Sequence, residues 1–182
     1  MENLAIVVPL KGFDVAKSRL RDGSVADVGD VARRLARGVL HAARPRPLFV
    51  ACESPDVELF ALDQGAQVIS SRAANLNEAV SHAYRALSPS YAHIVVAHGD
   101  LRDPHGLGTY TPREGVTVFT DDRGTGTNVL VVPTGHDFVF QFGRDSAHAH
   151  EREARRLHLE VFVNRRSAWR FDVDVPSDLA AE

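Results

Sequence analysis

Three aspartates could supply the oxygen ligands of a divalent cation. Asp172 and Asp174 alternate with apolar residues near the end of the sequence, and Asp100 follows the apolar run 94–97. In a strand, Asp172 and Asp174 would share one face roughly 6–7 Å apart, and two carboxylates at that distance repel unless a cation lies beside them. Ligands that are all oxygens suit Mg²⁺, which also binds substrate phosphates. A solvated strand edge, with Asp174 as a helix cap, explains the same spacing, so both interpretations stay open.

A cationic loop follows the first apolar run, residues 4–9. It contains Lys11, Lys17 and Arg19, and it carries a Lys-Ser pair as a P-loop does. Both glycines of the P-loop pattern are missing, however. The missing glycines indicate that this loop does not wrap a phosphate with its backbone amides.

Two loops combine glycine with hydroxyl side chains, a composition that suits the binding of anions. The turn 124–128 includes Thr127, and the segment from Gly143 to Ser146 opens a predicted helix. Backbone amides, and the dipole at a helix start, favour a negative charge in such places. Simpler explanations are a glycine-rich turn between two strands for the first loop and a serine N-cap for the second. Neither loop identifies a function alone.

Composition limits the classes of protein to which the chain could belong. The sequence has 182 residues, of which 44% are hydrophobic and 25% charged, and its net charge is −3. These values are typical of a soluble domain, and the lack of a basic excess argues against a nucleic-acid binder. The one cysteine, Cys52, excludes an internal disulfide, and no apolar run reaches transmembrane length. We expect a cytoplasmic protein with one domain over residues 1–182 and no membrane partner.

Short apolar runs alternate with helical patterns and define the elements that must position these residues. Strands are predicted at 4–9, 48–52, 66–70, 94–97, 116–120, 128–133, 159–163 and 171–173, and helices from 28 to before Pro45, at 55–64, at 76–87 with Asn75 as its cap, and at 146–157. This alternation predicts an α/β fold with a mostly parallel, doubly wound sheet. Ligands in such sheets bind beyond the carboxyl ends of the strands, which is where the loops described above would lie.

Six segments together resemble the CofC-type guanylyltransferases of coenzyme F420 biosynthesis, a MobA-like group with the nucleotide-diphospho-sugar transferase-like fold. Their order and spacing agree along almost the whole chain, and the Gly-Thr-Gly-Thr-Asn and Asp-x-Asp-x-Pro elements are fairly specific in combination. The segments are VVPLKGFDVAKSRL (7–20), NLNEAV (75–80), GDL (99–101), DDRGTGTNVLVV (121–132), FGRDSAHAH (142–150) and DVDVPSDL (172–179).

The resemblance implies a single-domain, three-layer αβα enzyme that transfers GMP from GTP to the phosphate of a small phosphorylated carboxylic acid and releases pyrophosphate. The acceptor would be phosphoenolpyruvate, 2-phospho-L-lactate or 3-phosphoglycerate, and Mg²⁺ would be the cofactor. The site residues of the family carry over to matching positions. They imply Mg²⁺ binding by Asp100, Asp172 and Asp174, acceptor binding by Thr127, Gly143 and Ser146, nucleotide binding by Lys11, Lys17, Arg19, Asn75 and Asn77, and catalytic roles for Lys11, Lys17 and Asp100.

The sequence departs from the family around one of the implied metal ligands. Residues 98–102 are HGDLR where the family has PADLP, Gly12 replaces a proline, and Asn75 replaces a glycine. These changes keep the aspartates but touch both substrate pockets. Two alternative functions are a related transfer that uses another nucleotide or a phosphonate acceptor, and a catalytically silent paralogue that binds a nucleotide. Edge strands in the C-terminal half could also pair two copies of the chain as a homodimer.

Overall fold

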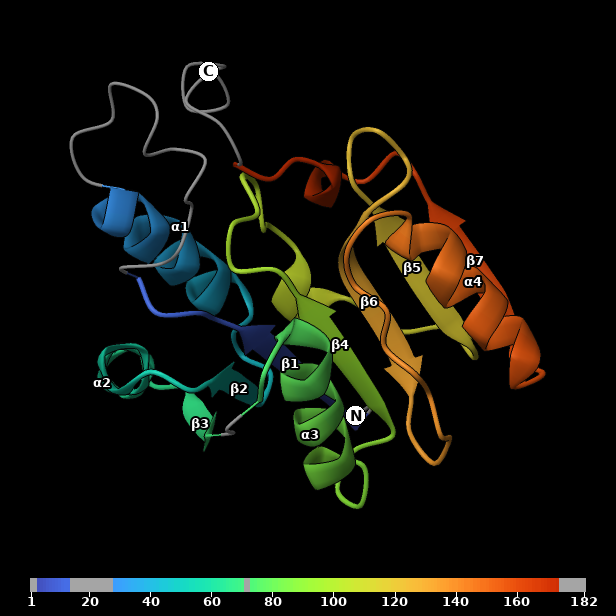
Figure 1. Ribbon diagram of the computed structural model, residues 1–182, viewed down its shortest axis with the longest axis horizontal. Coiled ribbons are helices and arrows are strands. Elements are labelled where there is room, and N and C mark those ends of the chain that lie inside the picture. The colour runs from blue at the N-terminus through green and yellow to red at the C-terminus, as the bar shows by residue number, and fades with distance from the viewer. Residues whose placement is uncertain (1–2, 14–27, 71–72, 174–182) are drawn as a thin grey trace.

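The computed structural model describes residues 3–13, 28–70 and 73–173, which form one seven-stranded sheet with helices on both sides (Figure 1). The strands are β1 (Leu4–Pro9), β2 (Leu48–Cys52), β3 (Gln67–Ser70), β4 (His93–Ala97), β5 (Val116–Thr120), β6 (Thr127–Pro133) and β7 (Val161–Asn164). The α-helices are α1 (Val28–Ala42), α2 (Pro55–Asp63), α3 (Leu76–Leu87) and α4 (Ser146–Arg156), and the 3₁₀ helices are η2 (Leu107–Thr109) and η3 (Ala168–Arg170). The predicted three-layer α/β architecture is confirmed.

The order of strands reverses in the middle of the sheet, which runs β3-β2-β1-β4-β6-β5-β7. The chain adds β2 and β3 on one side of β1 and then returns to place β4 on the other side. Among the described strands, only β6 is antiparallel to its neighbours. Its connection from β5, residues 121–126, is too short for the crossover that parallel neighbours need. The sheet is therefore mostly parallel and doubly wound, as predicted.

Each central strand sends alternate side chains into two separate hydrophobic cores. In β1, for example, Ile6 belongs to the core under α1 and α2, whereas Val7 belongs to the core under α3 and α4. Alternation is a property of every strand, but here both faces are covered by helices. Both sets of side chains must then be apolar, which explains the uninterrupted apolar runs in the sequence.

The predicted helices and strands are present, with small shifts at their ends. The strand β7 begins at Val161 rather than at residue 159, because the Leu159 N–H still bonds to the Ala154 carbonyl at 3.0 Å and closes the end of α4. The strand predicted at 171–173 is wrong: η3 ends just before it, and it forms a single bridge in which Asp172 lies opposite Leu101. Within the described ranges, no helix is both long and apolar enough to span a bilayer.

Gly108 allows η2 to pack directly on the chain that follows α1. A Cβ atom at Gly108 would lie 1.9 Å from the carbonyl oxygen of Arg44, whereas one at Gly38, in α1, would have nothing within 4 Å. We expect Gly108→Ala to lower the free energy of unfolding by about 1–3 kcal/mol, because only a backbone shift relieves the overlap. Gly38→Ala should raise it by about 0.5–1 kcal/mol, because alanine is the better helix former. Urea denaturation measures both changes. A Gly108→Ala variant with the free energy of unfolding of the wild-type protein would contradict this packing.

Candidate functional site

The loops after β1 and β4 meet where the order of strands reverses. Leu10 follows β1 and Gly99 follows β4, and a Cβ atom on Gly99 would lie 2.3 Å from Leu10 Cδ2. Glycine thus provides the space that lets the two loops pack together. Parallel strands that lead away from such a point leave a crevice for ligands at their carboxyl ends. Exposed Lys11 and half-buried Asp100 both lie at this edge of the sheet.

Asp100 and Asp172, two of the predicted metal ligands, lie on paired segments. The Arg102 N–H donates to the Phe171 carbonyl at 2.8 Å, and the Val173 N–H donates to the Asp100 carbonyl at 3.1 Å. These two hydrogen bonds join the end of β4 to the segment after η3. The structure therefore brings two aspartates that are far apart in the sequence to the same edge of the sheet.

Buried Asn128, in β6, fixes the segment that carries Asp172. Its side-chain amide donates to the carbonyls of Trp169 at 3.1 Å and Arg170 at 3.0 Å. Its own carbonyl accepts from the His98 N–H at 3.0 Å, just before the loop that contains Asp100. Sequence reasoning missed this role. The available signal in the sequence was a polar residue at the start of an otherwise apolar strand, where an apolar side chain would be expected.

The third predicted metal ligand, Asp174, lies outside the described residues, as do Lys17 and Arg19. Within the described ranges, no three His, Cys, Asp or Glu side chains come together as a metal-binding group. Asp100 and Asp172 nevertheless have the oxygen donors that Mg²⁺ prefers, and this ion commonly completes its shell with phosphate oxygens and water. The donor set fits Mg²⁺, whose binding stays a prediction.

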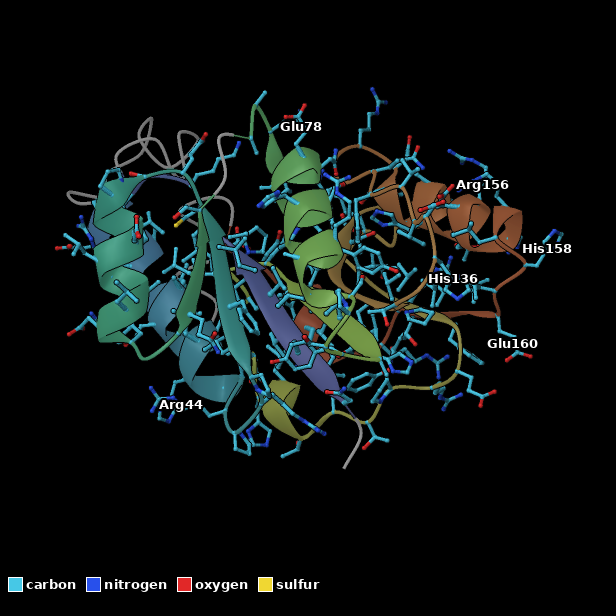
Figure 2. All side chains as sticks on the ribbon, turned by 90° about the horizontal axis from the view of Figure 1, so that it is seen from below. Arg44, Glu78, His136, Arg156, His158 and Glu160 are labelled. Carbon is cyan, nitrogen blue, oxygen red and sulfur yellow. The ribbon has the colours of Figure 1, made fainter. Side chains whose placement is uncertain are left out.

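A cavity of about 290 Å³ opens beside Lys11, and its wall includes Glu53 at the end of β2 and Asn75 before α3. Ligand pockets typically range from about 300 to 1,000 Å³, so this cavity suits the base of a nucleotide rather than the whole molecule. Asn75 is the N-cap of α3, as predicted, because its Oδ1 accepts from the Glu78 N–H at 3.0 Å. In the view of Figure 2, Glu78 lies at the upper edge of the molecule and Arg44 at the lower edge.

Asn77 uses both polar atoms of its side chain to hold the backbone of Phe142. Its Nδ2 donates to the Phe142 carbonyl at 3.1 Å, and its Oδ1 accepts from the Phe142 N–H at 2.6 Å. The residue lies in the first turn of α3, so it links the helix beside the cavity to the segment that leads into Gly143. A contact between Asn77 and the nucleotide stays a prediction. Its contact with Phe142 was not predicted.

The glycine-rich turn and the start of α4 are bonded to each other. Asp121 Oδ1 accepts from the Thr125 N–H at 2.8 Å and from the Gly126 N–H at 2.9 Å, which folds the turn. The Ala147 N–H then donates to the Thr125 carbonyl at 2.9 Å. Thr127, which follows the turn, is thereby placed near the first turn of α4.

Ser146 is the first residue of α4 rather than its N-cap, so the serine-cap explanation is wrong. Asp145 takes the N-cap position with φ 55° and makes no side-chain cap hydrogen bond. Gly143 precedes it with φ 131°, a conformation that favours glycine. The Ser146 side chain is only 1% exposed. No side chain caps α4, but the Ser146 N–H donates to the Gly143 carbonyl at 3.3 Å and the Ala147 N–H to the Thr125 carbonyl, so two amides of its first turn already have backbone partners.

His150, in α4, is completely buried and contacts both of the glycine-containing loops. Its Nδ1 lies 3.1 Å from Thr127 Oγ1, and its Nε2 accepts from the Gln141 N–H at 3.0 Å. Burial, reinforced by nearby His98, lowers the pKa of His150 to about 4, so the ring is neutral near pH 7. The sequence analysis gave this residue no role, because its partners Thr127 and Gln141 lie elsewhere in the sequence.

The chain is similar to one family of enzymes over nearly its whole length. A family model described as guanylyl transferase CofC-like matches residues 4–181. A phosphoenolpyruvate guanylyltransferase from Salinispora arenicola is 32% identical over 187 residues, which cover 96% of this chain and 85% of that protein. A 3-phospho-D-glycerate guanylyltransferase from Phenylobacterium zucineum is 27% identical over 173 residues, which cover 91% and 77% of the two chains. A solved nucleotidyl transferase from Methanothermobacter shares the fold, with a TM-score of 0.68 at 15% identity over 99% of this chain and 95% of that one.

Burial of a neutral His150 should make the stability of the protein depend on pH. The pKa of this residue falls from 6.5 to about 4 on folding, with His98 and Glu153 as the neighbouring titratable groups. Below pH 6.5 the unfolded chain therefore binds a proton that the folded protein does not, and stability is lost as the pH falls towards 4. We expect a loss of about 3 kcal/mol from this residue across that window.

Urea denaturation as a function of pH measures this loss, and two variants isolate its source. His150→Asn removes the titrating ring and should flatten the pH dependence. His148→Asn, an exposed change on the same helix, should retain the dependence of the wild-type protein. A His150→Asn variant with the full wild-type slope would contradict a buried neutral ring.

Proposed function

The chain belongs to the CofC-like guanylyl transferase family, and from this premise we propose that it transfers GMP from GTP to the phosphate of a small phosphorylated carboxylic acid, with Mg²⁺ and with release of pyrophosphate. Relatives named for phosphoenolpyruvate and for 3-phospho-D-glycerate support this class of acceptor. The resemblance of the sequence to the F420 enzymes adds 2-phospho-L-lactate as a candidate and supports a role in coenzyme F420 biosynthesis.

The position of β4 in the sheet is the observation that carries the proposal. This strand lies between β1, which leads into the cavity, and β6, which begins at Thr127. Asp100 follows β4, so it stands between the two sides of the crevice. Since β6 is antiparallel to β4, its first residue lies at the same edge of the sheet as Asp100. This arrangement would put a metal ligand between a donor and an acceptor, which suits an enzyme that joins two phosphorylated molecules.

In the proposed reaction, a phosphate oxygen of the acceptor attacks the α-phosphorus of GTP. The bond from that phosphorus to the oxygen of the β-phosphate breaks, and pyrophosphate leaves in line. The acceptor phosphate is already ionised near pH 7, so no general base is required. Bound Mg²⁺ would offset the repulsion between the two polyanions and stabilise charge in the transition state.

The residues of the chain divide this task between two sides. Exposed Lys11 lies beside the cavity and would hold the triphosphate, with Lys17 and Arg19 of the same loop as further proposed contacts. The Thr127 and Ser146 hydroxyls, together with Gly143 before α4, would bind the phosphate and carboxylate of the acceptor. The donor side would thus use cationic side chains, and the acceptor side hydroxyl groups beside a glycine.

A matrix of pyrophosphate release tests the proposed reaction. It crosses GTP, CTP, ATP and UTP with phosphoenolpyruvate, 2-phospho-L-lactate, 3-phosphoglycerate and simple phosphonates, with Mg²⁺ and with a chelator. We expect release with GTP and a phosphorylated carboxylic acid, and none with the chelator. Release with only another nucleotide or a phosphonate would replace this function by the related transfer, and tight nucleotide binding without any release would indicate a silent paralogue.

Asp100→Asn should lower kcat/KM by at least about 100-fold, because it removes the charge that would hold the cation where transition-state charge develops. The fold should be retained, since the Asp100 carbonyl makes the hydrogen bond to Val173 and the backbone is unchanged. Asp63→Asn, an exposed change at the end of α2 and away from the crevice, should leave kcat/KM unaltered. Activity of Asp100→Asn within a few-fold of the wild-type enzyme would contradict the metal assignment.

A further inference from the structure

His150 makes two hydrogen bonds that together determine which of its ring nitrogens carries the proton. The Gln141 N–H can only donate, so Nε2 of His150 must be the acceptor and must carry no proton. A neutral imidazole then has its single proton on Nδ1. The group that lies 3.1 Å from this nitrogen is the hydroxyl of Thr127. Nδ1–H is therefore the donor, and Thr127 Oγ1 is the acceptor.

This direction has a consequence for the Thr127 hydroxyl. A hydroxyl has one proton to donate and two lone pairs. One lone pair of Oγ1 faces His150, so the hydroxyl proton must point away from the ring. Within the described part of the chain, no other hydrogen bond to Thr127 Oγ1 is formed. The proton thus has no acceptor among the described residues, and a ligand that reaches Thr127, which is 3% exposed, could accept it.

The surroundings of His150 keep the ring in this state. The ring is completely buried between Phe138 and Phe142, whose centroids lie 6.1 Å and 4.8 Å from its own. The titratable groups that face it are His98 and Glu153, and burial outweighs the attraction of the Glu153 carboxylate for a proton. A protonated ring would also direct a second N–H at the Gln141 N–H. The neutral tautomer with the proton on Nδ1 is the one that fits both neighbours.

We infer that His150 is a positioning residue, which orients the Thr127 hydroxyl so that it donates its proton to an anionic oxygen of the acceptor. The inference rests on the proposed function, in which Thr127 faces the acceptor. The same ring holds Gln141, two residues before Gly143, so one side chain fixes both glycine-containing loops of the acceptor side. It touches no substrate and acts only through these two residues.

Two substitutions separate the two hydrogen bonds of the ring. In His150→Asn, the side-chain amide lies near the position of Nδ1 and can still donate to Thr127. In His150→Gln, the amide reaches the position of Nε2 and can still accept from Gln141, but Thr127 loses its donor. Both changes remove the ring from the same core, so they provide matched controls for a general loss of packing.

The KM for phosphoenolpyruvate should rise about tenfold or more in His150→Gln, which corresponds to one misdirected hydrogen bond to an anion. It should stay within about threefold of wild type in His150→Asn, and the KM for GTP should change little in either variant. Thr127→Val should show a comparable rise, and adding His150→Gln to Thr127→Val should cause no further rise. Equal rises for the Asn and Gln variants, or an equal rise in the KM for GTP, would overturn the positioning role.

Two measurements that need no turnover distinguish failure of this inference from failure of the proposed reaction. Calorimetric titration with phosphoenolpyruvate should rank wild type and His150→Asn together and above His150→Gln. If the protein shows that ranking but releases no pyrophosphate, the proposed reaction is contradicted and the positioning role is retained. Nitrogen NMR of the histidine ring reports the tautomer of the free enzyme, and a proton on Nε2 would overturn the inference whatever the activity.

Discussion

The antiparallel pairing of β6 with β4 is the constraint on which the candidate site depends. Ala97, the last residue of β4, pairs with Val129 near the start of β6. Thr127 therefore lies at the edge of the sheet where Asp100 emerges, whereas a parallel β6 would carry it to the opposite edge. The short connection after β5 enforces this direction, and Asp121 closes the turn with two hydrogen bonds. The short, hydrogen-bonded turn after β5 thus determines that Thr127 and Asp100, which are far apart in the sequence, lie at the same edge of the sheet.

Buried polar side chains pair with backbone N–H groups on the proposed acceptor side, as a neighbouring strand would otherwise do. The segment 138–142 belongs to no strand, and unpaired backbone N–H groups in such a place cost free energy. Asn77, His150 and Glu153 accept from three of its N–H groups, those of Phe142, Gln141 and Val139 respectively. A hydrogen bond from Arg156, which is labelled in Figure 2, lowers the pKa of Glu153 and keeps that carboxylate charged. Side chains of helices α3 and α4 thus together hold the segment 138–142, which leads into Gly143.

Most of the fold could be predicted from the sequence because burial on both faces leaves apolar runs that Gly and Pro interrupt. Strands β1, β2 and β5 and helix α3 have the predicted bounds. The aspartates and the glycine-rich turn have local patterns and were found in the same way. The hydrogen bonds of Asn77 and His150 were not predicted, because their partners lie elsewhere in the chain: Asn77 and Phe142 are 65 positions apart. A polar residue within a helical pattern gives no sign of what it will face after folding.

The two sides of the crevice differ in how they can discriminate between anions. A flexible cation in water, such as exposed Lys11, attracts phosphates with little regard for the rest of the molecule. Buried hydroxyls at Thr127 and Ser146 are fixed in place, and a ligand that leaves such groups unpaired binds much less well. We therefore expect selectivity between substrates to come from the proposed acceptor side, where hydrogen bonds from buried side chains hold the groups that would bind the ligand. Relatives named for different acceptors are similar in sequence to this chain over most of its length, as expected if loop geometry rather than the sheet selects the substrate.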